Sequence, residues 1–495
     1  MTDTCVAEDR SPYALPDLRE GTQRESRFLF WMSAVFLVFH FIRTFGNNFW
    51  GDDAYTANVV QHSVSEIIDI ASTDAHSPFY YLIVKGFCEV FGYSDWTYQF
   101  SSYVPYLILM VLTLTLVRRW FGTQTAILMS VMLSAVPISV NYITEVRMYE
   151  WALLFVFSTT LAAYAFCQRQ NVLNAVLLVI FGVMSAYIHL YSLLSAGMIA
   201  LAVVAIMLLK RRFAIVIGAC IAGVIAVIPL LDKARYVFDS VSENFWIERL
   251  PYPHEFIGYA FGDVLMTIPA IFGFGFIVTV MLWELGKSAG PIDQYMIPKE
   301  GGRHLTQIGC LMILVLTPFV FTNLFGFSVS LFTRPVFVLK YAFSVLAGLW
   351  LLAGVCMTRF KPESKALIKF LAVLLVFAVP ISGYNLGCEA VQCVDTADLL
   401  DATGDISGDN AITDYRAFSY SVLEFYYPGV QVTLVEDGRY VDHIDPSKGN
   451  WLFLEGKLSD EQRSEFESKG YSVETVRTDT HLAHYKVNVY QLVPM

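Results

Sequence analysis

The sequence predicts a mainly α, polytopic membrane protein of about 11 transmembrane helices, with interfacial helices in its first outer loop and a small C-terminal soluble α/β domain. Of the 495 residues, 56% are hydrophobic and only 16% are charged, as is typical of integral membrane proteins. Long apolar stretches recur up to residue 385. The rest of the chain is more polar and accounts for the net charge of −11, because residues 386–495 hold 19 acidic and 8 basic side chains whereas residues 1–385 balance at 25 and 25. A charge confined to this tail gives no indication of nucleic-acid binding.

Each apolar stretch is close to the roughly 20 residues that cross a bilayer as a helix. With the N-terminus inside, the inner segments hold 17 Lys and Arg residues against 8 in the outer loops, so this orientation is favoured. The first 27 residues are polar and lack the apolar core of a cleavable signal peptide. We therefore expect a multi-pass protein of the cell (plasma or inner) membrane with a cytoplasmic N-terminus and an extracytoplasmic C-terminal domain. The predicted spans are 28–45, 99–117, 123–140, 149–167, 172–189, 191–209, 213–231, 264–284, 305–326, 341–358 and 366–385.

This reading divides the chain into a cytoplasmic tail (1–27), a transmembrane domain (28–385) and an extracytoplasmic α/β domain (386–495). The first outer loop, 46–98, contains two helix patterns. Residues 78–92 are apolar, but the segment is short and charged, and a span here would turn the Lys and Arg excess outward. We expect an interfacial helix there, and a second amphipathic one over 55–71, so that the loop forms a structured lid.

The tail has the pattern of a soluble domain. Strands are predicted at 429–435, 450–455, 471–477 and 484–493. A helix over 460–469 is indicated by Ser459 with Gln462 three residues on, a capping box, and ends at Gly470. Cys388 and Cys393 flank a short predicted loop and could pair if that side is oxidising.

Rare charged residues interrupt the apolar sequence, and such groups in or beside a membrane are candidates for function. Asp52 and Asp53 directly follow the first span. A carboxylate there can act as a general base, and a pair can hold a divalent cation. With Glu145 they could coordinate Mg²⁺ or Mn²⁺, although no ligand spacing demands a metal. The alternative is a solvated turn that only ends the helix.

Two further clusters fall on the same predicted face. His76 lies in the segment 74–78, where it could bind an anion or donate to a substrate oxygen; the alternative is a helix cap formed by its neighbours. Glu145 and Tyr149 are four residues apart and would share a helix face, while Arg147 projects elsewhere. Arginine suits phosphate because its planar fork donates two parallel hydrogen bonds. Alternatively, a Glu–Arg pair anchors the helix end at the headgroup level.

The remaining candidates are isolated groups at outer turns. They are His189 and Tyr191 between spans five and six, Arg235 after span seven, and Lys340 and Tyr341 before span ten. The basic groups among them either clamp a lipid-linked phosphate or contact lipid headgroups without specificity.

The ordered motifs resemble a known family. The run Asp52-Asp53-Ala-Tyr, the segment His76 to Tyr81 and the segment Thr144 to Tyr149 resemble the GT-C class of membrane glycosyltransferases, in the branch of the protein O-mannosyltransferases and the lipid A aminoarabinose transferase. The likeness covers roughly residues 28–345. Asp53 stands where that family usually has Glu, and Lys340 stands where relatives often have Arg.

The resemblance implies transfer of a sugar from a polyprenyl-phosphate donor to an extracytoplasmic acceptor, which is a protein, a lipid or a growing glycan. It implies a hexosyl- or pentosyltransferase in which Asp52 or Asp53 is the base, the displacement inverts the anomeric carbon, and His76, Glu145, Arg147, Tyr149, His189, Tyr191, Arg235, Lys340 and Tyr341 bind the donor phosphate or the substrates. Two alternatives remain open. A secondary transporter would place its ionisable groups near the bilayer midplane on broken helices, and a ligase that attaches a lipid-linked polymer would use similar donors.

Overall fold

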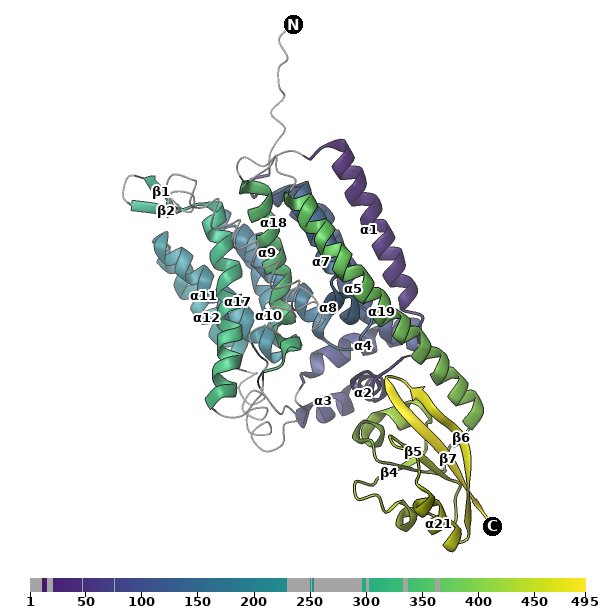
Figure 1. The fold of residues 1–495 in the computed structure, drawn as a ribbon. Helices are drawn as coiled ribbons and strands as arrows, with labels where there is room; N and C mark the ends of the chain where they lie inside the picture. The colour runs from purple at the N-terminus through teal and green to yellow at the C-terminus, as the bar shows by residue number, and fades with distance from the viewer. Residues whose placement is uncertain are drawn as a thin grey trace.

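A computed structural model describes residues 11–15, 21–46, 48–74, 76–228, 250, 252, 296–299, 302–332, 337–360 and 366–495. These residues form a helical bundle and a small domain with a β-sheet, which lies at the end of the bundle opposite the start of α1 (Figure 1). The predicted fold class is confirmed. Within the bundle, the elements are α1 (Gln23–Arg43), α2 (Gly51–Val59), α3 (Val64–Ser72), α4 (Pro78–Phe91), α5 (Asp95–Leu112), the π-helical turn η1 (Thr113–Val117), α6 (Arg118–Phe121), α7 (Thr123–Ala135), α8 (Pro137–Tyr142), α9 (Tyr149–Gln168), α10 (Val172–Ile188), α11 (Leu190–Leu209), α12 (Phe213–Val227), the antiparallel strands β1 (Met296–Lys299) and β2 (Gly302–Leu305), α17 (Gln307–Phe332), the 3₁₀ helix η4 (Leu339–Val345), α18 (Leu346–Phe360) and α19 (Ala366–Thr403).

Among the described residues, five helices are long and apolar enough to cross a membrane: α1, the run Asp95–Phe121, α9, α11 and α17. Shorter apolar helices are Thr123–Ala135, Val172–Ile188 and Lys340–Cys356. The predicted span 123–140 is wrong in its length. Because a residue before proline is disfavoured in the helical region, Val136 is extended (φ −70°, ψ 127°), and Pro137 starts the separate helix α8. The predicted span 264–284 lies outside the described residues.

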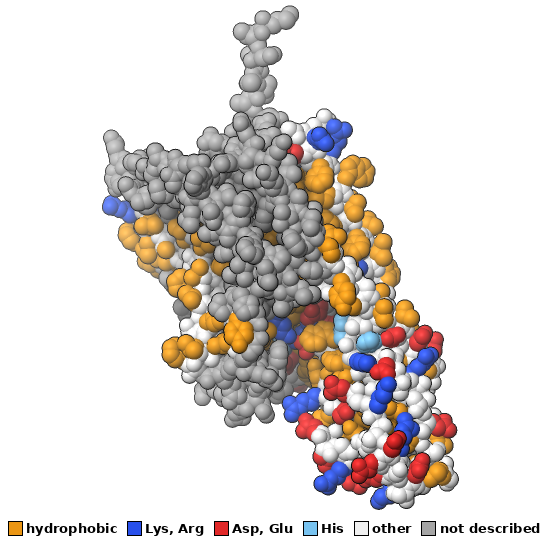
Figure 2. Space-filling view, viewed as in Figure 1, with side chains coloured by type: hydrophobic (Ala, Val, Ile, Leu, Met, Phe, Trp, Pro, Cys, Tyr) orange, Lys and Arg blue, Asp and Glu red, His pale blue; other side chains and the backbone are white. Residues whose placement is uncertain are grey.

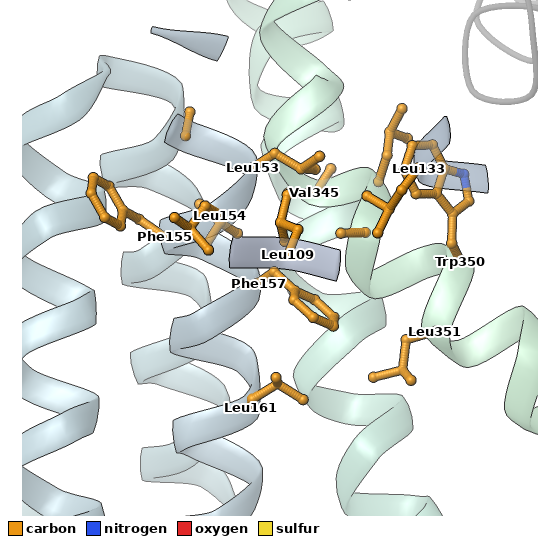
Figure 3. Packing of buried hydrophobic residues seen from close by; sticks show 14 of the residues in the cluster. Leu109, Leu133, Leu153, Leu154, Phe155, Phe157, Leu161, Val345, Trp350 and Leu351 are labelled. Atoms are coloured by element: carbon orange, nitrogen blue, oxygen red, sulfur yellow. The ribbon is translucent and has the colours of Figure 1, made fainter. Parts of the chain in front are cut away.

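The bundle is built around α9, which is apolar on all sides and buried from Tyr149 to Cys167. Its side chains Leu153 and Phe157 lie near Leu109 of α5 and Val345 of η4 in the core (Figure 3). At the periphery, α1 exposes large apolar side chains such as Phe28 and Trp31. Figure 2 shows apolar side chains along the flank of the bundle and charged ones gathered on the C-terminal domain. This is the surface expected of a membrane-embedded bundle with a water-exposed end.

The segment predicted as the first outer loop is helical, as expected, but its first helix pattern is divided. The amphipathic helix expected over 55–71 is two helices, α2 and α3, because Ser63 and Glu66 form a capping box that starts α3. The apolar segment after Pro78 forms the single helix α4, with Ser77 as its N-cap. These helices lie at the same end of the bundle as the C-terminal domain (Figure 1).

The C-terminal domain contains a five-stranded sheet of order β4-β3-β5-β7-β6, in which β3 pairs in parallel with β4 and β5, and β7 pairs antiparallel with β5 and β6. β3 and β5 are buried along their whole length, which suits parallel strands. The predicted capping box at Ser459 and Gln462 is confirmed, and so are the four predicted strands; β3 is additional. The elements are β3 (Asn410–Thr413), the π-helical η5 (Phe418–Val422), α20 (Leu423–Tyr426), β4 (Gln431–Leu434), the 3₁₀ helix η6 (Tyr440–His443), β5 (Asn450–Leu454), α21 (Asp460–Ser468), β6 (Tyr471–Leu482) and β7 (Tyr485–Pro494).

α19 crosses the predicted boundary at residue 386 and continues as a helix to Thr403. The loop expected around Cys388 and Cys393 is therefore wrong. Five positions along a helix correspond to a rotation of about 140°, so the two side chains leave different faces of α19.

Candidate active site

The first turn of α2 carries Asp52 and Asp53, where the helix dipole favours acidic side chains. Consecutive helical residues are rotated by about 100°. The two carboxylates therefore enter different surroundings, although they are neighbours in the sequence. Asp52 lies among cations, and Asp53 lies at a polar cavity.

Asp52 meets two cations on one carboxylate oxygen. Its Oδ2 lies 3.6 Å from Arg147 Nε and 3.7 Å from Lys340 Nζ. Burial alone would raise the pKa of Asp52, but the charges of Arg147 and Lys340 outweigh it and lower the pKa below its ordinary value. The structure thus brings together three candidates that are far apart in the sequence, and Asp52 is ionised at neutral pH.

Arg147 lies in the turn between α8 and α9 and is only 4% exposed. Its guanidinium is held from several sides. Nη1 lies 3.5 Å from the backbone oxygen of Asp52 and 3.4 Å from Thr56 Oγ1, and Nη2 lies 3.0 Å from His76 Nε2. The predicted Glu–Arg pair is not what holds this residue, since its ion pair is with Asp52.

His76 precedes α4 and links Arg147 to a further acid. Arginine can only donate, so His76 Nε2 accepts and its proton lies on Nδ1, which donates to Asp74 Oδ1 at 3.2 Å. Burial and the charge of Arg147 lower the pKa of His76, which agrees with a neutral ring. Asp74 Oδ2 also accepts from Tyr81 Oη at 2.6 Å. Of the predicted alternatives, Ser77 does cap α4, whereas Asp74 orients His76.

Lys340, at the start of η4, is surrounded by aromatic rings. Its ammonium lies 5.5 Å from the ring centre of Trp50 and 5.6 Å from that of Tyr149, within the range of cation–π attraction. The predicted site residues Tyr341, Tyr191 and His189 continue this wall: Tyr341 stacks on Tyr191 at 4.9 Å and lies 5.3 Å from His189. His189 also caps α11, its Nδ1 accepting from the Tyr191 backbone N–H.

Asp53 turns away from this cluster. Its Oδ1 accepts from the Val146 backbone N–H at 2.8 Å, so Asp53 fixes the turn that carries Arg147. Burial and the neighbouring carboxylates of Glu145 and Asp52 raise the pKa of Asp53 well above its ordinary value. Burial also raises the pKa of Glu145 to about 7. The predicted shared helix face of Glu145 and Tyr149 is wrong, because α9 begins only at Tyr149.

Asp53 and Glu145 line a polar cavity of about 430 Å³ at the junction of the bundle and the C-terminal domain. Two deeply buried side chains face it with acceptors that have no hydrogen-bond partner in the described part of the chain, Asn48 Oδ1 and Gln99 Oε1. The other lining residues are Arg43, Trp50, Asn141, Thr144, Asn385, Cys388, Glu389, Gln392, His484 and Tyr485. Its volume is in the range of small-molecule sites, about 300–1,000 Å³.

The structure does not arrange the possible metal set of Asp52, Asp53 and Glu145 around one point. Across the described ranges, no three His, Cys, Asp or Glu side chains are grouped so as to hold a metal ion. The predicted phosphate ligand Arg235 lies outside the described residues.

Comparison with known proteins supports the resemblance to the GT-C membrane glycosyltransferases. Residues 75–231, about a third of the chain, match the family described as dolichyl-phosphate-mannose-protein mannosyltransferase. The fold is similar to the crystal structure of ArnT from Cupriavidus metallidurans in the apo state (TM-score 0.59, 13% identity, covering 94% of this chain and 97% of that one). It is also similar to ArnT from the same organism bound to undecaprenyl phosphate (TM-score 0.55, 14% identity, 94% and 98% covered). No match is found among curated protein sequences.

The resemblance to the GT-C class is confirmed. The family match and the shared fold together indicate a multi-pass membrane glycosyltransferase.

Sequence reasoning missed several residues of the site. Tyr420 of the C-terminal domain donates to Asp52 Oδ1 at 3.3 Å, and Tyr81 and Thr56 support Asp74 and Arg147. Thr56 had a usable signal, because it is four residues after Asp52 and so lies on the same side of α2. Tyr420 had none, since it is separated from Asp52 by 368 positions.

Proposed function

We propose that this protein transfers a sugar from a polyprenyl-phosphate carrier to an acceptor on the extracytoplasmic side of the membrane, with Asp52 as the general base. The observation that carries the proposal is the Asp52 carboxylate with Arg147 and Lys340 within 4 Å. This arrangement supplies a base and the positive charge that a phosphate leaving group requires. The similarity to a structure bound to undecaprenyl phosphate supports a donor of this class.

In this proposal the donor phosphate binds beside Lys340 and Arg147. Lys340 is the more accessible cation, with 17% of its side chain exposed. Arg147, with 4% of its side chain exposed, adds a second positive charge from the interior. A bound phosphate competes with Asp52 for both cations. The carboxylate then loses part of the attraction that lowers its pKa, so donor binding itself makes Asp52 a stronger base.

The acceptor hydroxyl or amine loses its proton to Asp52 and attacks the anomeric carbon, while the bond to the phosphate oxygen breaks. A single displacement inverts that carbon, and the polyprenyl phosphate leaves between the two cations. The polar cavity on the Asp53 side of α2 suits a part of the substrate that carries hydroxyl groups, because Asn48 Oδ1 and Gln99 Oε1, which have no hydrogen-bond partner among the described residues, can accept from them. Asp53 is assigned a supporting role, since it is bound to the Val146 N–H and its raised pKa favours the neutral form at which it cannot act as a base.

The test is an assay of purified protein in lipid nanodiscs with a panel of polyprenyl-phosphate sugars, following release of polyprenyl phosphate and the anomeric configuration of the product. Asp52→Asn should lower turnover by about 10²–10⁴-fold, the usual contribution of a general base. The matched variant Asp53→Asn should stay within about tenfold of wild type. Near-normal turnover of Asp52→Asn, or a retained anomeric configuration, would refute the mechanism.

A further inference from the structure

α2 carries Asp52, yet this helix has no N-cap of its own. Trp50 occupies the cap position and its side chain makes no cap hydrogen bond. Helix N-termini leave backbone N–H groups that need partners, usually a Ser, Thr, Asp or Asn at this position. Here the partners come from a different domain.

Two tyrosine hydroxyls of the C-terminal domain accept from the backbone at the start of α2. The Phe49 N–H donates to Tyr426 Oη at 2.9 Å, and the Gly51 N–H donates to Tyr485 Oη at 3.2 Å. A third side chain of this domain acts as a donor: Ser421 Oγ donates to the Gly51 backbone oxygen at 2.8 Å. The beginning of α2 is therefore held by side chains from η5, α20 and β7.

The contact continues along α2. Asn58 Nδ2, near the end of the helix, donates to the backbone oxygen of Ser421 at 3.2 Å. The close approach also explains Gly51: a Cβ at this position would lie 3.0 Å from both Tyr420 Oη and Tyr485 Oη. Only a residue without a side chain lets both hydroxyls approach so closely.

One of these tyrosines reaches the carboxylate itself. Tyr420 Oη donates to Asp52 Oδ1 at 3.3 Å, whereas Oδ2 faces Arg147 and Lys340. A carboxylate that is bound through both oxygens cannot rotate freely about its terminal bond.

We propose that Tyr420 is a positioning residue for the Asp52 carboxylate, and that the C-terminal domain completes the active site by capping and clamping α2. This inference rests on the proposed role of Asp52 as base. The domain is thereby part of the catalytic unit: it supplies the cap that the α2 sequence lacks, and it fixes the oxygen of Asp52 that the cations do not hold.

The test compares Tyr420→Phe with the matched control Tyr485→Phe, which removes a hydroxyl next to Gly51 without touching the Asp52 carboxylate. Tyr420→Phe should lower kcat about tenfold, the usual effect of one hydrogen bond to a charged group. It should leave the donor KM within about twofold and move the acid limb of the kcat/KM profile to higher pH, because a donor to the ionised carboxylate is lost. Tyr485→Phe should speed amide hydrogen exchange over residues 49–59 and leave the acid limb in place.

The proposal is overturned if Tyr420→Phe keeps both the wild-type kcat and the wild-type acid limb, or if it loses activity only in parallel with thermal stability and without a shift of the limb. A second measurement does not need activity: a double-mutant cycle of Tyr420→Phe and Asp52→Ala on thermal unfolding, because Ala removes the oxygen that accepts from Tyr420 whereas Asn would keep one. Wild-type protein that transfers no sugar would contradict the proposed function alone. The cycle then decides the positioning contact, and zero coupling between the two residues overturns it.

Discussion

Replacement of Lys340 by Gln tests whether the cation cluster sets the proton affinity of Asp52. Lys340 Nζ lies 3.7 Å from Asp52 Oδ2. At this separation the Coulomb attraction is about 1 kcal/mol with the dielectric constant of water and about 4 kcal/mol with an effective value of 20. Both side chains are partly exposed, at 17% and 25%, so the interaction lies between these limits. Removal of the charge should raise the pKa of Asp52 by about 1–3 units.

The assay is the pH dependence of kcat/KM, whose acid limb reports the base of the free enzyme. The pKa of Asp52 is depressed in the folded protein, so the active, ionised form persists to lower pH in the wild type than in Lys340→Gln. The acid limb of the variant should therefore move to higher pH by the same 1–3 units. The donor KM should rise as well, because a phosphate contact is lost. Lys340→Arg is the control: it keeps the charge and should keep the acid limb. Loss of activity in Lys340→Gln with an unmoved limb would refute the assignment of Asp52 as base.

Three further predictions follow from the site. Asp53→Asn can still accept from the Val146 N–H, so its free energy of unfolding should stay within about 1 kcal/mol of wild type. Asp53→Ala leaves that buried N–H unpaired and should lower the free energy of unfolding by about 1–3 kcal/mol. Thermal unfolding in detergent measures both variants, and equal losses would contradict the role of this bond. Asp74→Ala should lower kcat about tenfold, because the His76 Nδ1–H loses its acceptor and the ring loses its orientation, and a wild-type kcat would show that the ring needs no such support. The pKa of Glu145 is raised from 4.5 to about 7 in the folded protein. Between these two pH values Glu145 is therefore protonated in the folded state and ionised in the unfolded state. The stability contributed by this proton should thus be lost as pH rises through that window, and Glu145→Gln should abolish that loss in a melting-temperature series.

The convergence of the site could be predicted from the sequence because it depends on topology. The Lys and Arg distribution argues against a span over residues 78–92, and without that span an even number of predicted helices separates positions 52, 147 and 340, which places them at the same end of the bundle. Such an argument predicts which residues lie at the same end of the bundle. It does not fix which pair makes contact, and so the sequence suggested a Glu145–Arg147 pair where the structure has Arg147 with Asp52.

The C-terminal contribution could not be predicted for two physical reasons. α19 changes from apolar to polar composition near residue 386, which looks like the end of a helix, yet Leu399 and Thr396 are buried against the sheet and keep the helix intact to Thr403. The strand β3 has only four residues, too few for an alternating pattern, and it is buried on both faces. Without these elements, no sequence signal places Tyr420 beside Asp52.

The neighbouring carboxylates on α2 illustrate how one helix can supply an ionised acid and a neutral one. A rotation of one residue directs Asp52 toward Arg147 and Lys340, whose charges keep it ionised. The same rotation directs Asp53 toward Glu145 and a backbone N–H, where burial and the neighbouring carboxylates outweigh the charge of Arg147 and raise its pKa, so its proton is retained. Environments that push two pKa values apart are what an acid–base assignment requires. We therefore propose Asp52 as the base not because it comes first in the motif but because its side of α2 carries the cations, and a chain with the cations moved to the other side would exchange the two roles.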